Sequence, residues 1–376
     1  MQFNYRSLMA GREARISAGV LIAAVVIGSI HVVLTCKAPT CEKGDDENRY
    51  PMMMPKVTGT AVLSKISLLI YSIKRLIIER PSKGVAKAKQ QQNELSKKEC
   101  VGGMNGNCEK RTVYFIRHGQ SAWNHTFDKS RGLLRVLLST IQLVFFEVVF
   151  AVTNDSFMFD TPLSTRGINQ ALELAKNISE SNGLIEENIR KVLMDEEGSN
   201  NIKLYTSNLR RAQSTLMLAL QKRISEKKER VTVLGELEET VGNPDCVSLY
   251  TNFGCSTAPC MEVMMVADKV KKYSDILLPG DVASAYSLSL YEKMLQFNNR
   301  IFREKEQTLI VCGHSRWIRY YMSIFLPQAS NLEYKNRKIG NVDMLRFDVY
   351  RKQLNNGDHF YMVDEASVKL VYKNKV

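Results

Sequence analysis

Four short apolar runs, each followed closely by charged or histidine side chains, constrain the fold of this chain more than any other feature. The runs are residues 112–116 (TVYFI), 202–206 (IKLYT), 231–234 (VTVL) and 308–312 (TLIVC). Patterns typical of helices lie between them, at residues 167–179, 210–221 and 286–302. Buried strands that alternate with helices predict an α/β domain with a mostly parallel sheet.

Reactive side chains follow each predicted strand at once. Arg117 and His118 come after the first, Arg210 and Arg211 after the second, three glutamates after the third, and His314 after the fourth. In an open parallel sheet, ligands bind at the carboxyl ends of the strands. We therefore expect two imidazoles, at least one guanidinium pair and a carboxylate to meet at one edge of the sheet.

This set of side chains suits phosphoryl transfer. A phosphate monoester carries nearly two negative charges at neutral pH and repels an anionic nucleophile, whereas a neutral imidazole such as that of His118 is not repelled. Neighbouring arginines keep such an imidazole unprotonated, and their planar guanidinium groups fit phosphate oxygens bidentately. We expect Arg117 and Arg211 to hold the phosphoryl group, with His314 as a further donor.

The leaving oxygen requires a proton from a general acid. Two glutamates after the third predicted strand, Glu239 and Glu236, are candidates for this role.

Four segments, in order, resemble the histidine phosphatase superfamily, in its phosphoglycerate mutase-like branch. The first, residues 117–124 (RHGQSAWN), is similar to the signature of that family. The others are residues 160–171 (DTPLSTRGINQA), 207–215 (SNLRRAQST) and 311–315 (VCGHS), so the resemblance extends from about residue 112 to about residue 349.

The resemblance implies a three-layer α/β/α fold and an active site without a cofactor. It implies that His118 becomes phosphorylated, that Arg117, Arg211 and His314 bind the phosphoryl group, and that Asn124 lines the pocket. Water would then hydrolyse the phosphohistidine, and covalent catalysis of this kind needs no cofactor and no metal. The acid of the family usually lies in a Leu-x-Glu element before a Gly-rich turn; the resemblance favours Glu239, which Gly242 follows three residues later, with Glu236 as the alternative. Long inserts at residues 127–157 and 240–290 separate the family segments, and we expect them to form the rim of the pocket, where loops set specificity.

The N-terminal third is organised differently. Residues 16–34 contain no Asp, Glu, Lys or Arg, and this is about the length of a helix that crosses a bilayer. We predict an N-terminal segment at 1–15, a transmembrane signal anchor at 16–35 and a basic linker at 36–110. A cleaved signal peptide is the alternative, although its apolar stretch is usually shorter.

The linker is basic and contains an amphipathic pattern. Residues 1–110 hold 17 Lys and Arg against 9 Asp and Glu, in a chain of net charge +13. Basic and apolar residues alternate between positions 65 and 89, which predicts a helix on an anionic membrane face or, equally, a short helix packed on the catalytic domain. Because an apolar run precedes the basic tail, we expect lipid rather than nucleic acid beside it.

A second apolar run, residues 131–152, is not predicted to cross the membrane. Between Arg135 and Glu147 it has only 11 uncharged residues. A crossing here would also place the two halves of the predicted site on opposite sides of the bilayer. We interpret it as a helix inserted into the catalytic domain, which comprises residues 111–376.

The sequence therefore predicts a single-pass membrane enzyme that hydrolyses a phosphorylated small molecule or phosphoprotein without a metal. A mutase with the same chemistry and a non-catalytic protein that binds phosphorylated ligands at a membrane are the alternatives. Asn124 lies in a glycosylation sequon, Asn124-His125-Thr126, and yet is predicted to line the pocket. That conflict favours a catalytic domain facing the cytoplasm rather than a lumen.

Overall fold

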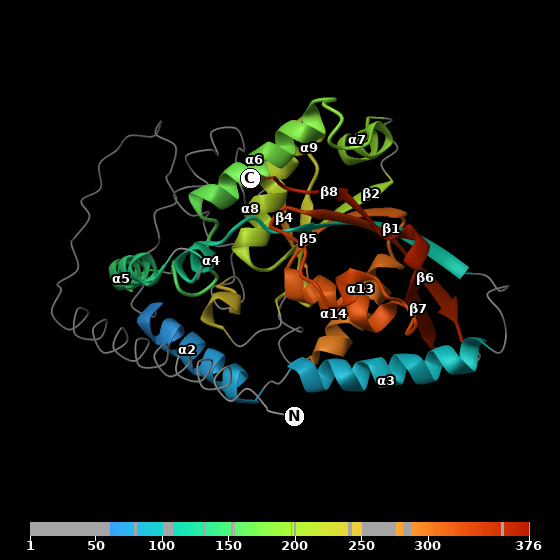
Figure 1. Ribbon diagram of the computed structural model, residues 1–376, viewed down its shortest axis with the longest axis horizontal. Coiled ribbons are helices and arrows are strands. Elements are labelled where there is room, and N and C mark those ends of the chain that lie inside the picture. The colour runs from blue at the N-terminus through green and yellow to red at the C-terminus, as the bar shows by residue number, and fades with distance from the viewer. Residues whose placement is uncertain are drawn as a thin grey trace.

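A computed structural model of the chain gives an α/β fold around one central sheet, as the sequence predicts (Figure 1). The structure describes residues 61–78, 81–100, 108–128, 130, 132–151, 153, 155–196, 198, 201–239, 243–249, 276–280, 288–354 and 357–375.

The sheet has eight strands, and five of them form a parallel block. The order is β4-β3-β2-β5-β1-β6-β7, with β8 also paired to β6. β1 to β5 are parallel to one another, and β6, β7 and β8 are antiparallel additions, with β6 paired to β1. The bounds are β1 Cys108–Arg117, β2 Ile202–Ser207, β3 Val231–Leu234, β4 Leu277–Pro279, β5 Thr308–Gly313, β6 Met344–Gln353, β7 His359–Val363 and β8 Lys369–Tyr372. All four predicted strands are present.

Helices cover both faces of the sheet and make three layers. On one face lie α6 (Thr165–Ser179), α7 (Glu187–Met194), α8 (Arg210–Ala219) and α9 (Gln221–Lys227). On the other lie α13 (Leu290–Ile301), α14 (Ser315–Phe325) and α3 (Pro81–Cys100). Shorter elements are α4 (Ala122–Thr126), η2 (Gly235–Leu237), η3 (Pro244–Cys246), η6 (Glu333–Lys335) and η7 (Glu365–Ser367). Because both faces are covered, the central parallel strands have continuous buried stretches that are mostly apolar, such as residues 113–116 of β1 and 309–312 of β5.

The region predicted to be a basic linker contains two helices that pack on the domain. Val85 and Ala88 of α3 are buried in the same apolar cluster as α13 and α14. Gln92, one further turn along the same face, donates to the carbonyl of Tyr361 at 2.5 Å. α3 is therefore a component of the outer helical layer.

The preceding helix, α2 (Ala61–Ile78), packs beside the inserted segment. Its Leu68 and Leu69 are buried against Phe159, Val247 and Leu249. Lys65 of α2 is also buried, and it lies 3.4 Å from the carboxylate of Glu147 in α5 (Leu133–Val149). α5 is the helix predicted within residues 131–152.

The single-pass membrane location predicted from the sequence needs correction. None of the helices among the described residues is long and apolar enough to cross a membrane. The predicted anchor at residues 16–35 lies outside the described residues.

The packing of α3 leads to a stability prediction. Ala88→Asp would place a charge in the layer between α3 and the sheet, where nothing compensates its desolvation, and we expect a loss of about 3 kcal/mol of unfolding free energy. Ala86→Asp, the same change on the exposed face of the same helix, is the control and should leave stability nearly unchanged. Urea unfolding followed by circular dichroism measures both. Equal effects of the two substitutions would contradict this packing.

Candidate active site

The carboxyl ends of four neighbouring strands meet at one edge of the sheet. Arg117 at the end of β1 pairs with Gly313 at the end of β5, and Ser207 at the end of β2 pairs with Leu234 at the end of β3. His118 follows β1, His314 follows β5 and begins α14, and Arg211 lies in the first turn of α8. Glu239 follows the short turn η2 after β3. Parallel pairing thus brings distant segments together.

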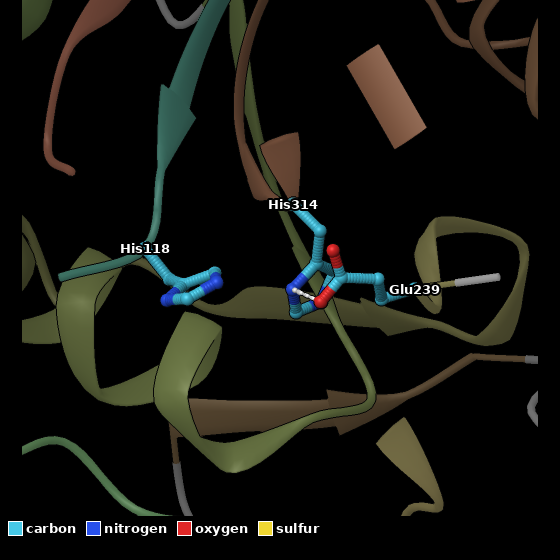
Figure 2. Close-up of side chains that lie close together, drawn as sticks. All are labelled: His118, Glu239 and His314. Atoms are coloured by element: carbon cyan, nitrogen blue, oxygen red, sulfur yellow. Dashed lines mark ion pairs between the residues drawn. The ribbon is translucent and has the colours of Figure 1, made fainter. Parts of the chain in front are cut away.

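The two histidine rings face each other in this place (Figure 2). Their centroids are 5.0 Å apart, with the ring planes inclined by 55°, and both side chains are buried. The backbone of His118 is fixed on both sides, because its N–H donates to the carbonyl of Gly313 and its carbonyl accepts from the side chain of Asn341. These bonds fix the backbone from which the ring of His118 extends into the site.

A hydrogen bond sets the tautomer of His118. Its Nδ1 lies 2.6 Å from the carbonyl oxygen of Gly119. A carbonyl can only accept, so Nδ1 carries the proton in the neutral ring. The lone pair is left on Nε2, the atom available for nucleophilic attack.

Both imidazoles are held neutral by their surroundings. Burial lowers the pKa of His118 well below its ordinary value of 6.5, and the charge of Arg211 lowers it further. Burial also lowers the pKa of His314, again with Arg211 and Arg117 acting in the same direction. A buried ring beside two guanidinium groups would add a third positive charge on protonation, and that is unfavourable.

Arg211 is buried and has only part of its hydrogen-bonding capacity filled. Its Nη1 donates to the carbonyl of Asp245 at 2.6 Å, and its Nη2 donates to Glu239 at 3.0 Å. Its Nε has no hydrogen-bond partner among the described residues, and the same holds for Nε of Arg117 and Nδ1 of His314. Three buried nitrogen atoms thus remain available for an anionic ligand.

The three glutamates after β3 have different partners. Glu239 Oε2 lies 3.0 Å from Arg211 Nη2 and 3.6 Å from His314 Nδ1. Glu236 instead pairs with Arg300 at 2.8 Å, and Glu238 pairs with Lys293 at 3.1 Å. Of the two sequence candidates for the general acid, the structure brings Glu239 to the histidines and turns Glu236 away.

Glu239 is an anion in this arrangement. Burial alone would raise the pKa of its carboxyl, but the charge of Arg211, followed by smaller contributions from its neighbours, outweighs burial and keeps the pKa below its ordinary value. To act as an acid it must first take up a proton, which requires weaker contact with Arg211.

Asn124, predicted to line the pocket, lies in α4. Its backbone N–H donates to the side chain of Ser121, which caps that helix. Arg117, which is also predicted to bind the phosphoryl group, donates from Nη1 to the carbonyl of Ile339 at 2.6 Å. The roles of these residues stay predictions.

The ligand atoms of His118, Glu239 and His314 lie within 4.8 Å of one another, which is close enough for a metal ion. Their surroundings fit an anion better. The carboxylate is already paired with Arg211, and a second guanidinium, Arg117, is near enough to affect the pKa of both histidines. A divalent cation here would meet two positive charges at close range.

Several residues that hold the site in place were not singled out from the sequence. Ser207 Oγ lies 2.9 Å from His314 Nε2, and Thr215 Oγ1 accepts from the backbone of Gly119 at 3.0 Å. The position of Ser207 directly after a strand was a signal that could have identified it. Asp245 and Asn341 carry no such signal, because they reach Arg211 and His118 from loops distant in sequence.

Asp160 connects two loops at the start of α8. Its Oδ1 accepts from the backbone of Arg210 at 2.8 Å, and its Oδ2 accepts from the backbone of Leu249 at 3.2 Å. Arg210 itself extends away from the histidines to pair with Asp155. Asp160 therefore positions Arg211 and the segment bearing Asp245 relative to each other.

Two glycines allow α6 to touch residues 117–124, which we call the catalytic segment after their predicted role. A Cβ on Gly119 would lie 2.6 Å from the carbonyl oxygen of Gly167, and a Cβ on Gly167 would lie 2.1 Å from the carbonyl oxygen of Gln120. Real side chains do not fit at such distances from backbone atoms. The close approach lets Ser164 and Gln170 hydrogen-bond the backbone of Gln120.

No protein-family model matches the sequence, and no curated protein matches it. Solved structures give distant matches, at TM-scores too low to bear on activity or substrate. A phosphoserine phosphatase from Entamoeba histolytica, bound to 3-phosphoglyceric acid, has 15% identity and a TM-score of 0.31, and the match covers 70% of this chain and 97% of that one. A mycobacterial glucosyl-3-phosphoglycerate phosphatase has 15% identity and a TM-score of 0.34, covering 70% and 100%. An alpha-ribazole phosphatase from Shigella flexneri has 15% identity and a TM-score of 0.32, covering 70% and 98%.

The glycine contact predicts a selective loss of ligand affinity. Gly167→Ala forces α6 away from Gln120 and displaces the segment that carries His118, so we expect ligand binding at the site to weaken at least about tenfold, a free-energy change of about 1.4 kcal/mol. Gly84→Ala is the matched control, because a Cβ there meets nothing within 4 Å. Titration calorimetry with orthovanadate, a phosphate analogue, measures both. Wild-type affinity in Gly167→Ala would disprove the close contact.

Proposed function

We propose that the chain is a metal-independent phosphomonoester hydrolase of the histidine phosphatase type, with a phosphoglycerate mutase-like catalytic domain. The observation that carries the proposal is the buried, neutral His118, with Nε2 as its basic nitrogen, between two arginines that have unfilled hydrogen-bonding capacity. Such a site favours an anion that offers an electrophilic centre, and a phosphate monoester has both properties.

In the first step, the phosphate displaces Glu239 from Arg211 and takes up the unfilled donors of Arg117, Arg211 and His314. Nε2 of His118 attacks phosphorus in line, a P–N bond forms, and the P–O bond to the alcohol breaks. The fixed guanidinium groups stabilise the charge spread over the equatorial oxygens. The electron pair of the broken bond leaves with the alcohol oxygen.

Glu239 supplies the proton for that oxygen. Before substrate binds, Glu239 is an anion because of Arg211, but a bound phosphate neutralises Arg211 and adds negative charge nearby. Both effects raise the pKa of the carboxyl, so it takes up a proton when substrate binds. After the alcohol leaves, the carboxylate removes a proton from water, which attacks the phosphohistidine and releases inorganic phosphate.

Three groups orient the machinery without touching substrate in this scheme. Gly119 accepts the Nδ1 proton of His118, Ser207 binds Nε2 of His314, and Asp245 holds Arg211 through its carbonyl. Preorganisation of this kind lets the transition state form without rearrangement of the site.

The mechanism predicts a phosphohistidine at one position. Full-length protein with a chelator present should hydrolyse 4-nitrophenyl phosphate, and His118→Ala should lower kcat by a factor on the order of 10³ or more. His359→Ala, at an exposed histidine, is the control and should retain full activity. Rapid quenching with labelled substrate should yield an acid-labile phosphoimidazole whose formation stays constant from neutral pH down to 6.5, since the pKa of His118 lies well below that value.

Failure of this experiment has a clear meaning. Turnover that survives His118→Ala, or that chelation abolishes, excludes the mechanism. A phosphoenzyme that transfers its phosphoryl group to an acceptor more readily than to water would favour the mutase alternative. Tight vanadate binding without any turnover would favour a non-catalytic protein that binds phosphorylated ligands.

Leaving-group dependence tests the general acid. Glu239→Gln cannot donate the proton, so hydrolysis of an alkyl phosphate should slow by about 10²- to 10⁴-fold, whereas 4-nitrophenyl phosphate, whose leaving group needs no proton, should be far less affected. Glu236→Gln is the control: it breaks the pair with Arg300 and should leave the ratio of the two rates unchanged. An equal loss for both substrates in Glu239→Gln would rule out the assignment.

A further inference from the structure

A cleft lined by neither His118 nor His314 lies between α6 and the segment 333–343. It has a volume of about 390 Å³, and its walls are the first half of α6, the segment 333–343 and the chain after β8. None of the five proposed catalytic side chains is among its described lining residues. Its ligand therefore need not be the phosphoryl group under attack.

The cleft carries more positive than negative charge. Four cationic side chains line it, Arg166, Arg337, Lys338 and Lys373, against two carboxylates, Glu333 and Asp343. Arg337 is paired with Glu333 at 2.9 Å. The other three cations have no carboxylate partner within ion-pair distance in the part of the chain that the structure describes.

Asp343 offsets only one of these three cations. Its carboxylate is buried and accepts hydrogen bonds from the backbone N–H groups of Gly340 at 2.6 Å and Asn374 at 2.9 Å. These bonds hold two walls of the cleft together. The exposed rim carries Arg166, Lys338 and Lys373, so the cleft keeps a surplus of positive charge.

Lys338 experiences repulsion from several sides. Burial lowers the pKa of its amine, and the charge of Arg316 lowers it further, with Arg117 and Arg319 acting in the same direction and Glu239 opposing them. An anion placed beside Lys338 would relieve that repulsion. Lys338 also extends the positive field around Arg117 towards the cleft.

The walls of the cleft are the direct partners of the catalytic segment. Ile339 accepts from the Arg117 side chain, Asn341 donates to the carbonyl of His118, and Gln170 accepts from the backbone of Gln120. A ligand that tightens these walls would act on the positions of Arg117 and His118 through single hydrogen bonds.

We propose that this cleft is a second anion-binding site, suited to a compact group with two or more negative charges, and that it is joined to the phosphoryl site through Ile339 and Asn341. The anion is either a separate molecule or a second charged group of the substrate. The site itself does not depend on the proposed hydrolase function.

Calorimetric titration with methylenediphosphonate tests binding, because its P–C–P bridge cannot be hydrolysed. The full-length protein should show two classes of site. Lys338→Ala/Lys373→Ala should weaken one class at least tenfold, and Arg211→Ala should weaken the other. Lys222→Ala, at a lysine in a different surface cleft, is the control and should titrate as wild type.

The result that overturns the proposal is equally specific. If Arg211→Ala abolishes all binding, or if Lys338→Ala/Lys373→Ala titrates as wild type, the cleft holds no anion. Thermal unfolding of each variant checks that it is folded. A failure of the proposed hydrolase function would appear as absent turnover, with the cleft titration unaffected.

Kinetics then separate the two sources of the anion. If the substrate carries it, Lys338→Ala/Lys373→Ala should lower kcat/KM for an aryl phosphate with an added carboxylate at least tenfold more than it lowers kcat/KM for 4-nitrophenyl phosphate. If the anion is a separate molecule, the double variant should change kcat/KM by the same factor for both substrates. It should still lose one of the two classes of methylenediphosphonate site.

Discussion

Arg211 is a large cation buried almost completely in the interior, at the point where four strand ends meet. A charge in that position is stable only if its donors are bound, and the protein supplies the Asp245 carbonyl, the Glu239 carboxylate and a nearby Asp245 carboxylate at 3.8 Å. Its Nε has no hydrogen-bond partner among the described residues. Its charge adds to burial in lowering the pKa of both histidines, and it is the largest influence that keeps the carboxyl of Glu239 ionised.

The second constraint is the close backbone contact between the catalytic segment and α6. Gly119 and Gly167 remove the two Cβ atoms that would keep these elements apart. The contact turns the first half of α6 into a wall shared by the catalytic segment and the cationic cleft. A position far from the reacting atoms can therefore affect how His118 is presented.

The N-terminal helices extend this logic outward. α2 buries Leu68 and Leu69 against Val247 and Leu249, which continue the segment that places Asp245 on Arg211. α3 packs on α13 and α14, and His314 caps the N-terminus of α14. A domain that began at residue 111 would lack both supports.

Local patterns in the sequence were sufficient to predict the α/β class, the four strands and the place where reactive side chains gather. Each strand is an apolar run of the length that a buried strand needs, and parallel pairing brings such strand ends together. The family resemblance favoured Glu239, but local patterns alone do not separate it from Glu236, three residues away after the same strand. The choice depends on Arg300 and Arg211, which come from different helices.

The sequence by itself determined which groups gather at the strand ends, namely two imidazoles, two guanidinium groups and a carboxylate. It also determined the α/β scaffold that carries them. The tertiary structure decided which atom of His118 is basic, which glutamate faces it and how the segment at residues 61–100 is used. It also decided that the loop partners Asp245 and Asn341 belong to the site. These outcomes depend on burial and on contacts between distant residues, and both exist only once the chain is folded.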